Sequence, residues 1–311
     1  MIKFSVQAIL TSLLAIAFYL PLSAQDYEMI LPEKREVHEK DISQLSPLEI
    51  LEDSLVYFAD SMYNSPIPDF RVAGSYEFIR IFKTVLKTPN SYNYPFKKLS
   101  EKISILRSPD DAFRIYNWEV VRGTVEHRYY GVMQLTDGSF IPLVDVSDQI
   151  IRGAEDSIFN GTRWYGSLYY NILLRQIDDQ KIYFLIGWNG SSMNSEKKII
   201  EAFGFNSQGQ GMFGAPVFNM TERGKRRKVN RVVIEYQKGS RLSMNYDKET
   251  DQIIFDHCES QIGDPAKRYT YIPDGTYDGF KWDGHQWTMY ENVVQITDTP
   301  AGSPPLDKPI K

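Results

Sequence analysis

The segment YYGVMQLTDGSFIPLVDV, residues 129–146, contains two strand-like runs separated by a turn sequence. Residues 129–135 and 140–146 are rich in aromatic and aliphatic side chains, and Thr136-Asp137-Gly138-Ser139 lies between them. An Asp-Gly pair between two such runs is the strongest short-range signal for a β-hairpin. The segment therefore predicts two neighbouring antiparallel strands.

The same organisation recurs along the rest of the chain. Asp178-Asp179 separates strand-like residues 169–177 from 181–187, and a polar turn at 247–251 separates 242–246 from 252–256. Such short turns exclude the long helical crossovers that parallel strands require. From about residue 113 onward the sequence predicts a mainly β, antiparallel meander that forms either a sandwich or a propeller-like array.

Two helices are expected before this β region. Ser46-Pro47-Leu48-Glu49 has the residues of a capping box, and apolar side chains then follow at helical spacing, so a helix is predicted over 47–62. A second helix, with Asp69 as its cap, is expected to end near Lys87. We expect a helical N-terminal subdomain, residues 45–105, packed against an antiparallel β domain, residues 106–297. Residues 97–106 fit either a short helix or a first strand.

The first 24 residues predict a secretory signal peptide. A basic start is followed by the mostly apolar residues 8–20 and by the small residue Ala24, after which we expect cleavage. The apolar stretch is shorter than the ~20 residues that span a bilayer as a helix, although an uncleaved anchor is the alternative. Residues 25–44 read as a flexible lead-in and 298–311 as a disordered, proline-rich tail. The expected product is soluble, secreted or periplasmic, with no transmembrane segment in the mature chain.

Charge and composition exclude several partners and groups. The net charge of −5 gives no electrostatic reason to bind nucleic acid. The single cysteine, Cys258, rules out an intrachain disulfide. The histidines do not have the spacing of a single-element zinc site, and Pro216 argues against a dinucleotide helix after the glycine-rich residues 209–214. We therefore expect no metal and no cofactor.

Three carboxylates are the candidates for catalysis. The chain lacks the G-x-S-x-G sequence of serine hydrolases. Glycosidase carboxylates are brought together by folding and not by local spacing, so Glu119, Asp145 and Asp148 are candidate acids of a secreted glycan-active hydrolase. Each of them also fits an ordinary turn or surface role.

Aromatic side chains form the most suggestive candidate binding surface. If Asp283-Gly284 is a two-residue turn, Trp282 faces His285 and Phe280 faces Trp287. Exposed rings would offer stacking surfaces for sugars or peptides, whereas inward rings would simply form the core, which is the commoner arrangement. The candidate rings are those of four tryptophans, Trp164, Trp188, Trp282 and Trp287.

A dense basic cluster lies at residues 223–228. We interpret it as an exposed loop, with binding to an anionic surface such as phospholipid or lipopolysaccharide as the functional alternative. The candidate anion-binding residues are Lys225, Arg226, Arg227 and Lys228.

The leading hypothesis is an exported β protein that binds or scaffolds at the cell envelope, with an envelope protein or a glycan as its partner. The predicted signal peptide, the series of hairpins and the lack of a catalytic sequence pattern favour it. Whether the chain has any enzymatic activity is left open, with the hydrolase as the main alternative.

Overall fold

The computed structural model describes residues 45–123, 126–150, 152–190, 192–222 and 224–293. The predicted signal peptide (1–24), lead-in (25–44) and tail (298–311) lie outside these residues. Neither long helix in the described part has the apolar length needed to cross a bilayer.

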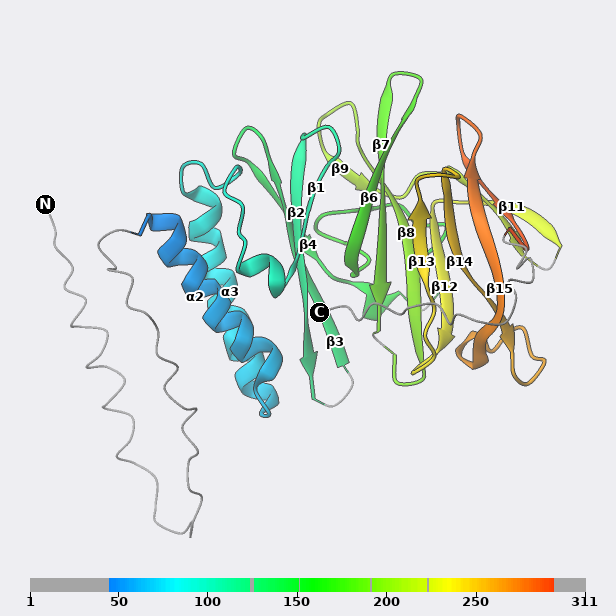
Figure 1. Cartoon of the computed structure of the whole chain (residues 1–311), viewed down its shortest axis with the longest axis horizontal. Coiled ribbons are helices and arrows are strands. Elements are labelled where there is room, and N and C mark those ends of the chain that lie inside the picture. The colour runs from blue at the N-terminus through cyan, green and yellow to red at the C-terminus, as the bar shows by residue number, and fades with distance from the viewer. Residues whose placement is uncertain (1–44, 124–125, 151, 191, 223, 294–311) are drawn as a thin grey trace, which may run out of the picture. The chain divides into compact units, whose positions relative to one another are not determined.

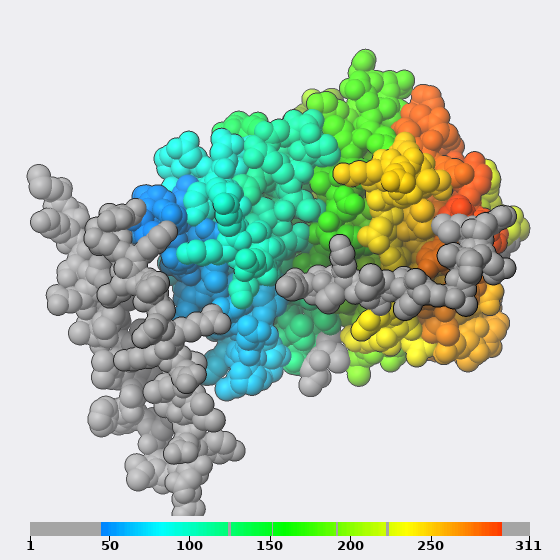
Figure 2. Space-filling view, viewed as in Figure 1, coloured from blue at the N-terminus to red at the C-terminus, as the bar shows by residue number. Residues whose placement is uncertain are grey.

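Three sheets and a helical pair are stacked as successive layers (Figure 1). One apolar cluster joins the helices to the first sheet, a second joins the first sheet to the central sheet, and a third joins the central sheet to the last. Figure 2 shows this order as bands of colour, from the blue helices to the orange strands. The predicted mainly antiparallel β fold is confirmed.

Helix α2 (Pro47–Asn64) begins as its sequence predicts. The Ser46 hydroxyl accepts a hydrogen bond from the Glu49 amide, and the Glu49 carboxylate accepts one from the Ser46 amide at 2.7 Å. These reciprocal bonds satisfy two amides that have no partner within the helix. The prediction of a capping box at this position is confirmed.

Helix α3 (Pro68–Lys87) ends where predicted but begins differently. Its cap is Ile67, which makes no side-chain cap bond, so the prediction that Asp69 caps the helix is wrong. Pro68 explains the difference, because its fixed φ suits the first helical position and its nitrogen has no hydrogen to satisfy. Asp69 instead lies in the first turn, where its negative charge favours the helix dipole.

The first sheet has the order β1-β2-β3-β4 and is antiparallel throughout. Phe113 and Ile115 of β2 face the central sheet, whereas Tyr116 and Trp118 face the helices. The predicted hairpin joins β3 to β4, with Gly138 in the left-handed region at φ 84°. Its strands are β1 (Ser104–Arg107), β2 (Phe113–Arg122), β3 (Glu126–Leu135) and β4 (Phe140–Val144). The ambiguous residues 97–106 form both η2 (Leu99–Glu101) and the start of β1.

The central sheet is buried on both faces. Tyr183 and Leu185 face the first sheet, and Phe184 and Ile186 face the third. Burial on two faces explains why the strand that holds these four residues is a continuous apolar run, without alternating polar residues. The order is β5-β9-β8-β7-β6, with β12 also beside β8. The strands are β5 (Phe159–Asn160), β6 (Leu168–Ile177), β7 (Gln180–Asn189), β8 (Ser195–Phe205), β9 (Gly211–Phe213) and β12 (Arg231–Gln237).

The third sheet has the order β11-β10-β16-β15-β14-β13. Its neighbours are antiparallel except for β10 and β16, which run parallel. The remaining short 3-10 helices are η3 (Ser147–Gln149) and η4 (Arg268–Thr270). The strands are β10 (Phe218–Glu222), β11 (Lys225–Val229), β13 (Met244–Asp247), β14 (Gln252–Ser260), β15 (Tyr271–Trp282) and β16 (Trp287–Tyr290).

The turn between β15 and β16 differs from the prediction. Trp282 pairs with Trp287, not with His285, and Phe280 pairs with Met289. The Asp283 carboxylate accepts hydrogen bonds from the amides of His285 and Gln286, at 3.0 and 2.9 Å. This side-chain capping stabilises a longer turn than the two residues expected, and so it changes the pairing of the rings.

A buried ion pair joins β12 to β8. Arg231 Nε lies 2.6 Å from Glu201 Oε2, Nη2 lies 2.9 Å from Oε1, and neither side chain has any exposed surface. Arg231 Nη1 also donates to the carbonyls of Ala154 and Ser157, and the guanidinium lies 4.6 Å from the centroid of the Phe159 ring. Burial raises the pKa of Glu201, although the charge and hydrogen bonds of Arg231 oppose that rise.

We expect Glu201→Gln to lower the free energy of unfolding by about 3–5 kcal/mol, because it leaves the buried guanidinium without its counter-charge. Urea denaturation measures this loss. The control is Arg80→Ala, which removes the exposed pair with Glu77 and should cost less than ~1 kcal/mol. Equal, small losses in the two variants would contradict the importance of the buried pair.

Candidate functional site

Strand β12 has a partner on one side only. It pairs with β8 from Arg231 opposite Glu201 to Gln237 opposite Ser195. In the part of the chain that the structure describes, no strand pairs with its other edge. An unpaired edge presents main-chain donors and acceptors that can bind another extended chain.

The direction of these main-chain groups follows from two hydrogen bonds. Arg231 donates its amide to the Glu155 carbonyl at 3.2 Å, on the side away from β8, whereas Lys238 donates to Asn194 on the β8 side at 2.9 Å. Main-chain groups alternate sides along an antiparallel strand. Val233 and Glu235 therefore direct their N–H and C=O groups away from β8, toward the open edge, which has no strand partner in the described part of the chain and has η4 lying near it.

Two cavities flank this edge. The smaller, of about 250 Å³, lies toward the third sheet, and its apolar lining includes Met220, Ile234, Phe255 and Met289. The larger, of about 570 Å³, has Ile150, Tyr165, Lys197 and Tyr269 in its lining. They meet at the edge itself, because both are lined by Glu155, Arg227, Val233, Glu235 and Arg268.

Ion pairs hold the shared wall of the two cavities. Arg227 Nη1 lies 2.8 Å from Asp156 Oδ1, and Arg268 Nη1 lies 3.2 Å from Glu155 Oε1. The Glu235 carboxylate accepts a hydrogen bond from the Ser195 hydroxyl. These contacts fix charged groups of both signs around the open edge.

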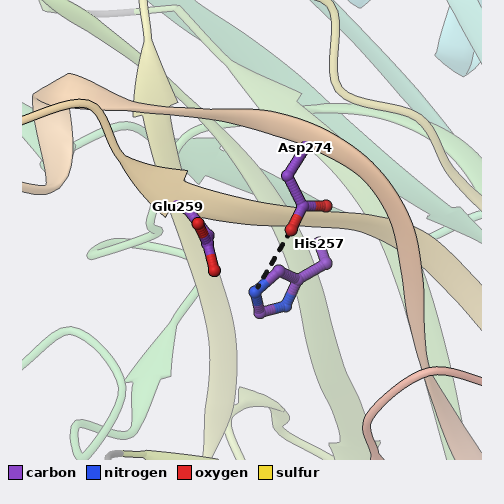
Figure 3. Close-up of side chains that lie close together, drawn as sticks. All are labelled: His257, Glu259 and Asp274. Atoms are coloured by element: carbon purple, nitrogen blue, oxygen red, sulfur yellow. Dashed lines mark ion pairs between the residues drawn. The ribbon is translucent and has the colours of Figure 1, made fainter.

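His257 lies beside the smaller cavity, in a cluster with Glu259 and Asp274 (Figure 3). Its Nδ1 is 2.7 Å from Oδ2 of the almost fully buried Asp278. Burial alone would lower the pKa of His257. The hydrogen bond to Asp278 and the charges of Asp278, Asp274 and Glu259 outweigh burial, so this pKa is raised.

The three predicted catalytic carboxylates have separate partners. Glu119 Oε2 lies 2.7 Å from His127 Nδ1, and exposed Asp148 lies 3.2 Å from Arg128 Nη1. Asp145 is buried, and its carboxylate accepts hydrogen bonds from three main-chain amides, those of Tyr129, Ser147 and Gly166. Asp145 thus ties strand and loop backbone together. None of the three lines the two cavities beside β12.

The tryptophans contribute mainly to the core. Trp164 and Trp287 are fully buried, so neither ring has a face for a ligand, and their proposed stacking role is wrong. Trp188 is half-buried and donates to Glu196 at 3.2 Å, while the Trp282 ring packs on Trp287 with centroids 5.3 Å apart. The core interpretation of these rings accounts for their placement.

The basic cluster is a strand, so the prediction of an exposed loop is wrong. Lys225, Arg226, Arg227 and Lys228 lie in β11, which pairs with β10 at the edge of the third sheet. Pairing with β10 overrides a local sequence that has little strand character. Lysine and arginine on an edge strand discourage pairing with other chains. Of the predicted site residues in the described part, only Arg227 lines the cavities beside β12.

Sequence reasoning missed both the open edge and the histidine cluster. The open edge depends on contacts between segments far apart in the chain, such as Glu155 with β12. The histidine cluster depends on the irregular register of β14 and β15, which brings Asp274 to His257. The only local signal for the cluster was the spacing of His257 and Glu259, since residues two apart on a strand share a face.

Comparison with protein-family models, with curated proteins and with solved structures gives no match to this chain.

The raised pKa of His257 predicts a pH-dependent contribution to stability. Protonated His257 stabilises the fold below its pKa in the unfolded chain, and this contribution is lost as pH rises through the higher pKa of the folded state. The stability difference between wild type and His257→Gln should therefore be larger at about pH 5.5 than at about pH 8.5.

Urea denaturation across this pH range measures the difference. His285→Gln is the matched control, because His285 is exposed and lies outside the cluster, and it should follow the wild-type profile. If the stability difference between wild type and His257→Gln did not change with pH, the interaction with Asp278 would not favour the protonated ring.

Proposed function

We propose that this protein is an exported binding component of the cell envelope that captures an extended segment of a partner protein along the open edge of β12. The observation that carries the proposal is the pair of cavities that meet at the unpaired main chain of Val233 and Glu235. Export is supported by the signal-like residues 1–24.

An added strand fits the chemistry of this edge. Its main chain would supply partners for N–H and C=O groups that are costly to leave unpaired. Successive side chains of a strand point to opposite faces, so an added strand would direct alternate side chains toward the smaller and the larger cavity. Main-chain bonds then supply affinity and the two cavities supply selectivity.

The smaller cavity favours an apolar side chain with a basic neighbour. Its lining methionines, Met220 and Met289, can adapt to differently shaped apolar groups. Five carboxylates line it against two guanidiniums, and those guanidiniums pair with Asp156 and Glu155. The carboxylates that line this cavity and are not paired in this way belong to Glu235, Asp256, Asp278 and Glu291.

A proline at position 235 tests the role of the main chain. Glu235→Pro removes an amide hydrogen that points away from β8, so the β8 ladder should be retained. Peptides selected from a random display library on the full-length protein should alternate apolar and polar residues. Their binding to Glu235→Pro should be about tenfold weaker or more, since a main-chain hydrogen bond is lost and the ring blocks the edge.

Glu235→Gln is the matched control, because it removes the same carboxylate as Glu235→Pro does but keeps the amide donor. Circular dichroism and urea denaturation show whether both variants keep the fold. The proposal fails if no peptide is enriched, or if Glu235→Pro and Glu235→Gln bind the selected peptides equally well.

Export has its own test. We expect the protein outside the cytoplasm with Gln25 as its first residue, which cell fractionation and mass spectrometry measure. Leu13→Arg with Leu14→Arg interrupts the apolar stretch and should leave the full-length chain inside the cell. Recovery of unprocessed wild-type chain in the cytoplasm would overturn the proposed location.

A further inference from the structure

We propose that His257, Glu259 and Asp274 form a binding site for a divalent transition-metal ion. The inference goes beyond capture of a peptide at β12 and does not depend on it. One imidazole nitrogen and two carboxylates from neighbouring strands supply the donor atoms, which lie within 4.8 Å of one another (Figure 3).

An irregularity in the sheet brings the donors together. Asp256 pairs with Tyr277 but Cys258 pairs with Pro273, so His257 on β14 lies opposite three residues of β15. Gly275 within that bulge has φ 91°, a left-handed conformation that glycine adopts without strain. The bulge changes the direction of β15 locally, and Asp274 Oδ2 lies 3.9 Å from His257 Nε2.

Neighbouring groups hold two of the three donors in place. His257 Nδ1 lies 2.7 Å from Asp278 Oδ2, and Oδ1 of that buried carboxylate accepts from the Asn292 amide at 3.2 Å. When Nδ1 carries the hydrogen donated to Asp278, the lone pair of Nε2 is free to bind a metal. Asp274 Oδ1 accepts from the amide and hydroxyl of Thr276, which leaves Oδ2 directed toward the cluster.

The charge of the cluster independently favours a cation. Three carboxylates, those of Glu259, Asp274 and Asp278, surround one imidazole. Within the described residues, the ion pairs of Asp274 and Asp278 are with His257, and no lysine or arginine pairs with any of the three carboxylates. A protonated His257 offsets one negative charge of three, whereas a divalent ion would offset two and leave the histidine neutral.

The donor set indicates which metals fit. One imidazole and two carboxylates suit Zn²⁺ and its first-row neighbours, whereas Mg²⁺ and Ca²⁺ prefer oxygen donors alone. Affinity for such a set rises from Mn²⁺ to Cu²⁺ and falls again at Zn²⁺, which still binds more tightly than Mn²⁺. Three protein donors leave at least one position for water, as in open zinc sites.

Titration calorimetry of the full-length protein with Zn²⁺ tests the site. We expect one saturable site in the wild type, with weaker binding of Mn²⁺ and no competition by an equal concentration of Ca²⁺. His257→Gln and Asp274→Asn should each weaken Zn²⁺ binding about tenfold or more, and Asp278→Asn should weaken it less, because Asp278 only orients the imidazole. His285→Gln should bind Zn²⁺ as the wild type does.

Glu259 is exposed, so Glu259→Gln should fold normally even if the substitutions at less exposed positions disturb the fold. Co²⁺ absorption in the visible range then reports whether nitrogen and oxygen donors surround the ion. The proposal is overturned if the wild type shows no saturable Zn²⁺ binding, or if Glu259→Gln and His257→Gln bind Zn²⁺ as tightly as His285→Gln does.

Discussion

The buried pair of Arg231 and Glu201 fixes the point at which the chain passes from the third sheet into the central one. The guanidinium also bonds the carbonyls of Ala154 and Ser157, so a surface loop, β8 and β12 depend on the same group. Removing two charges from water is costly, and it is offset only when all of these partners are in place. The position of β12, and hence of both cavities beside it, follows from this contact.

Two edge strands of the molecule differ in how they meet solvent. Strand β11 carries four consecutive basic residues, which disfavour association with another chain. Strand β12 carries mainly apolar residues, and cavities lie on both sides of its edge. The third sheet is thus protected from further pairing at its β11 edge, whereas the central sheet presents its β12 edge between two cavities.

Local signals predicted much of the fold. The capping box at Ser46 and the Asp-Gly turn at Gly138 act within a few residues, so the sequence was sufficient for both. Three predictions were wrong for different physical reasons. A neighbouring proline decided the cap at Asp69, hairpin pairing with the preceding strand β10 decided β11, and a side-chain cap decided the pairing of Trp282. The candidate site was beyond prediction, since its walls come from segments more than a hundred residues apart, such as Glu155 and Arg268.

The parallel pairing of β10 with β16 has a consequence for the order of folding. The helices and the first sheet join segments that are neighbours in the chain, so they can form as soon as they emerge during synthesis. Strand β10, by contrast, lacks one partner until almost all of the described chain has been made. In an incomplete chain, the edge of β10 that later pairs with β16 is therefore exposed to solvent. The chain is most prone to aggregate before β16 pairs with it.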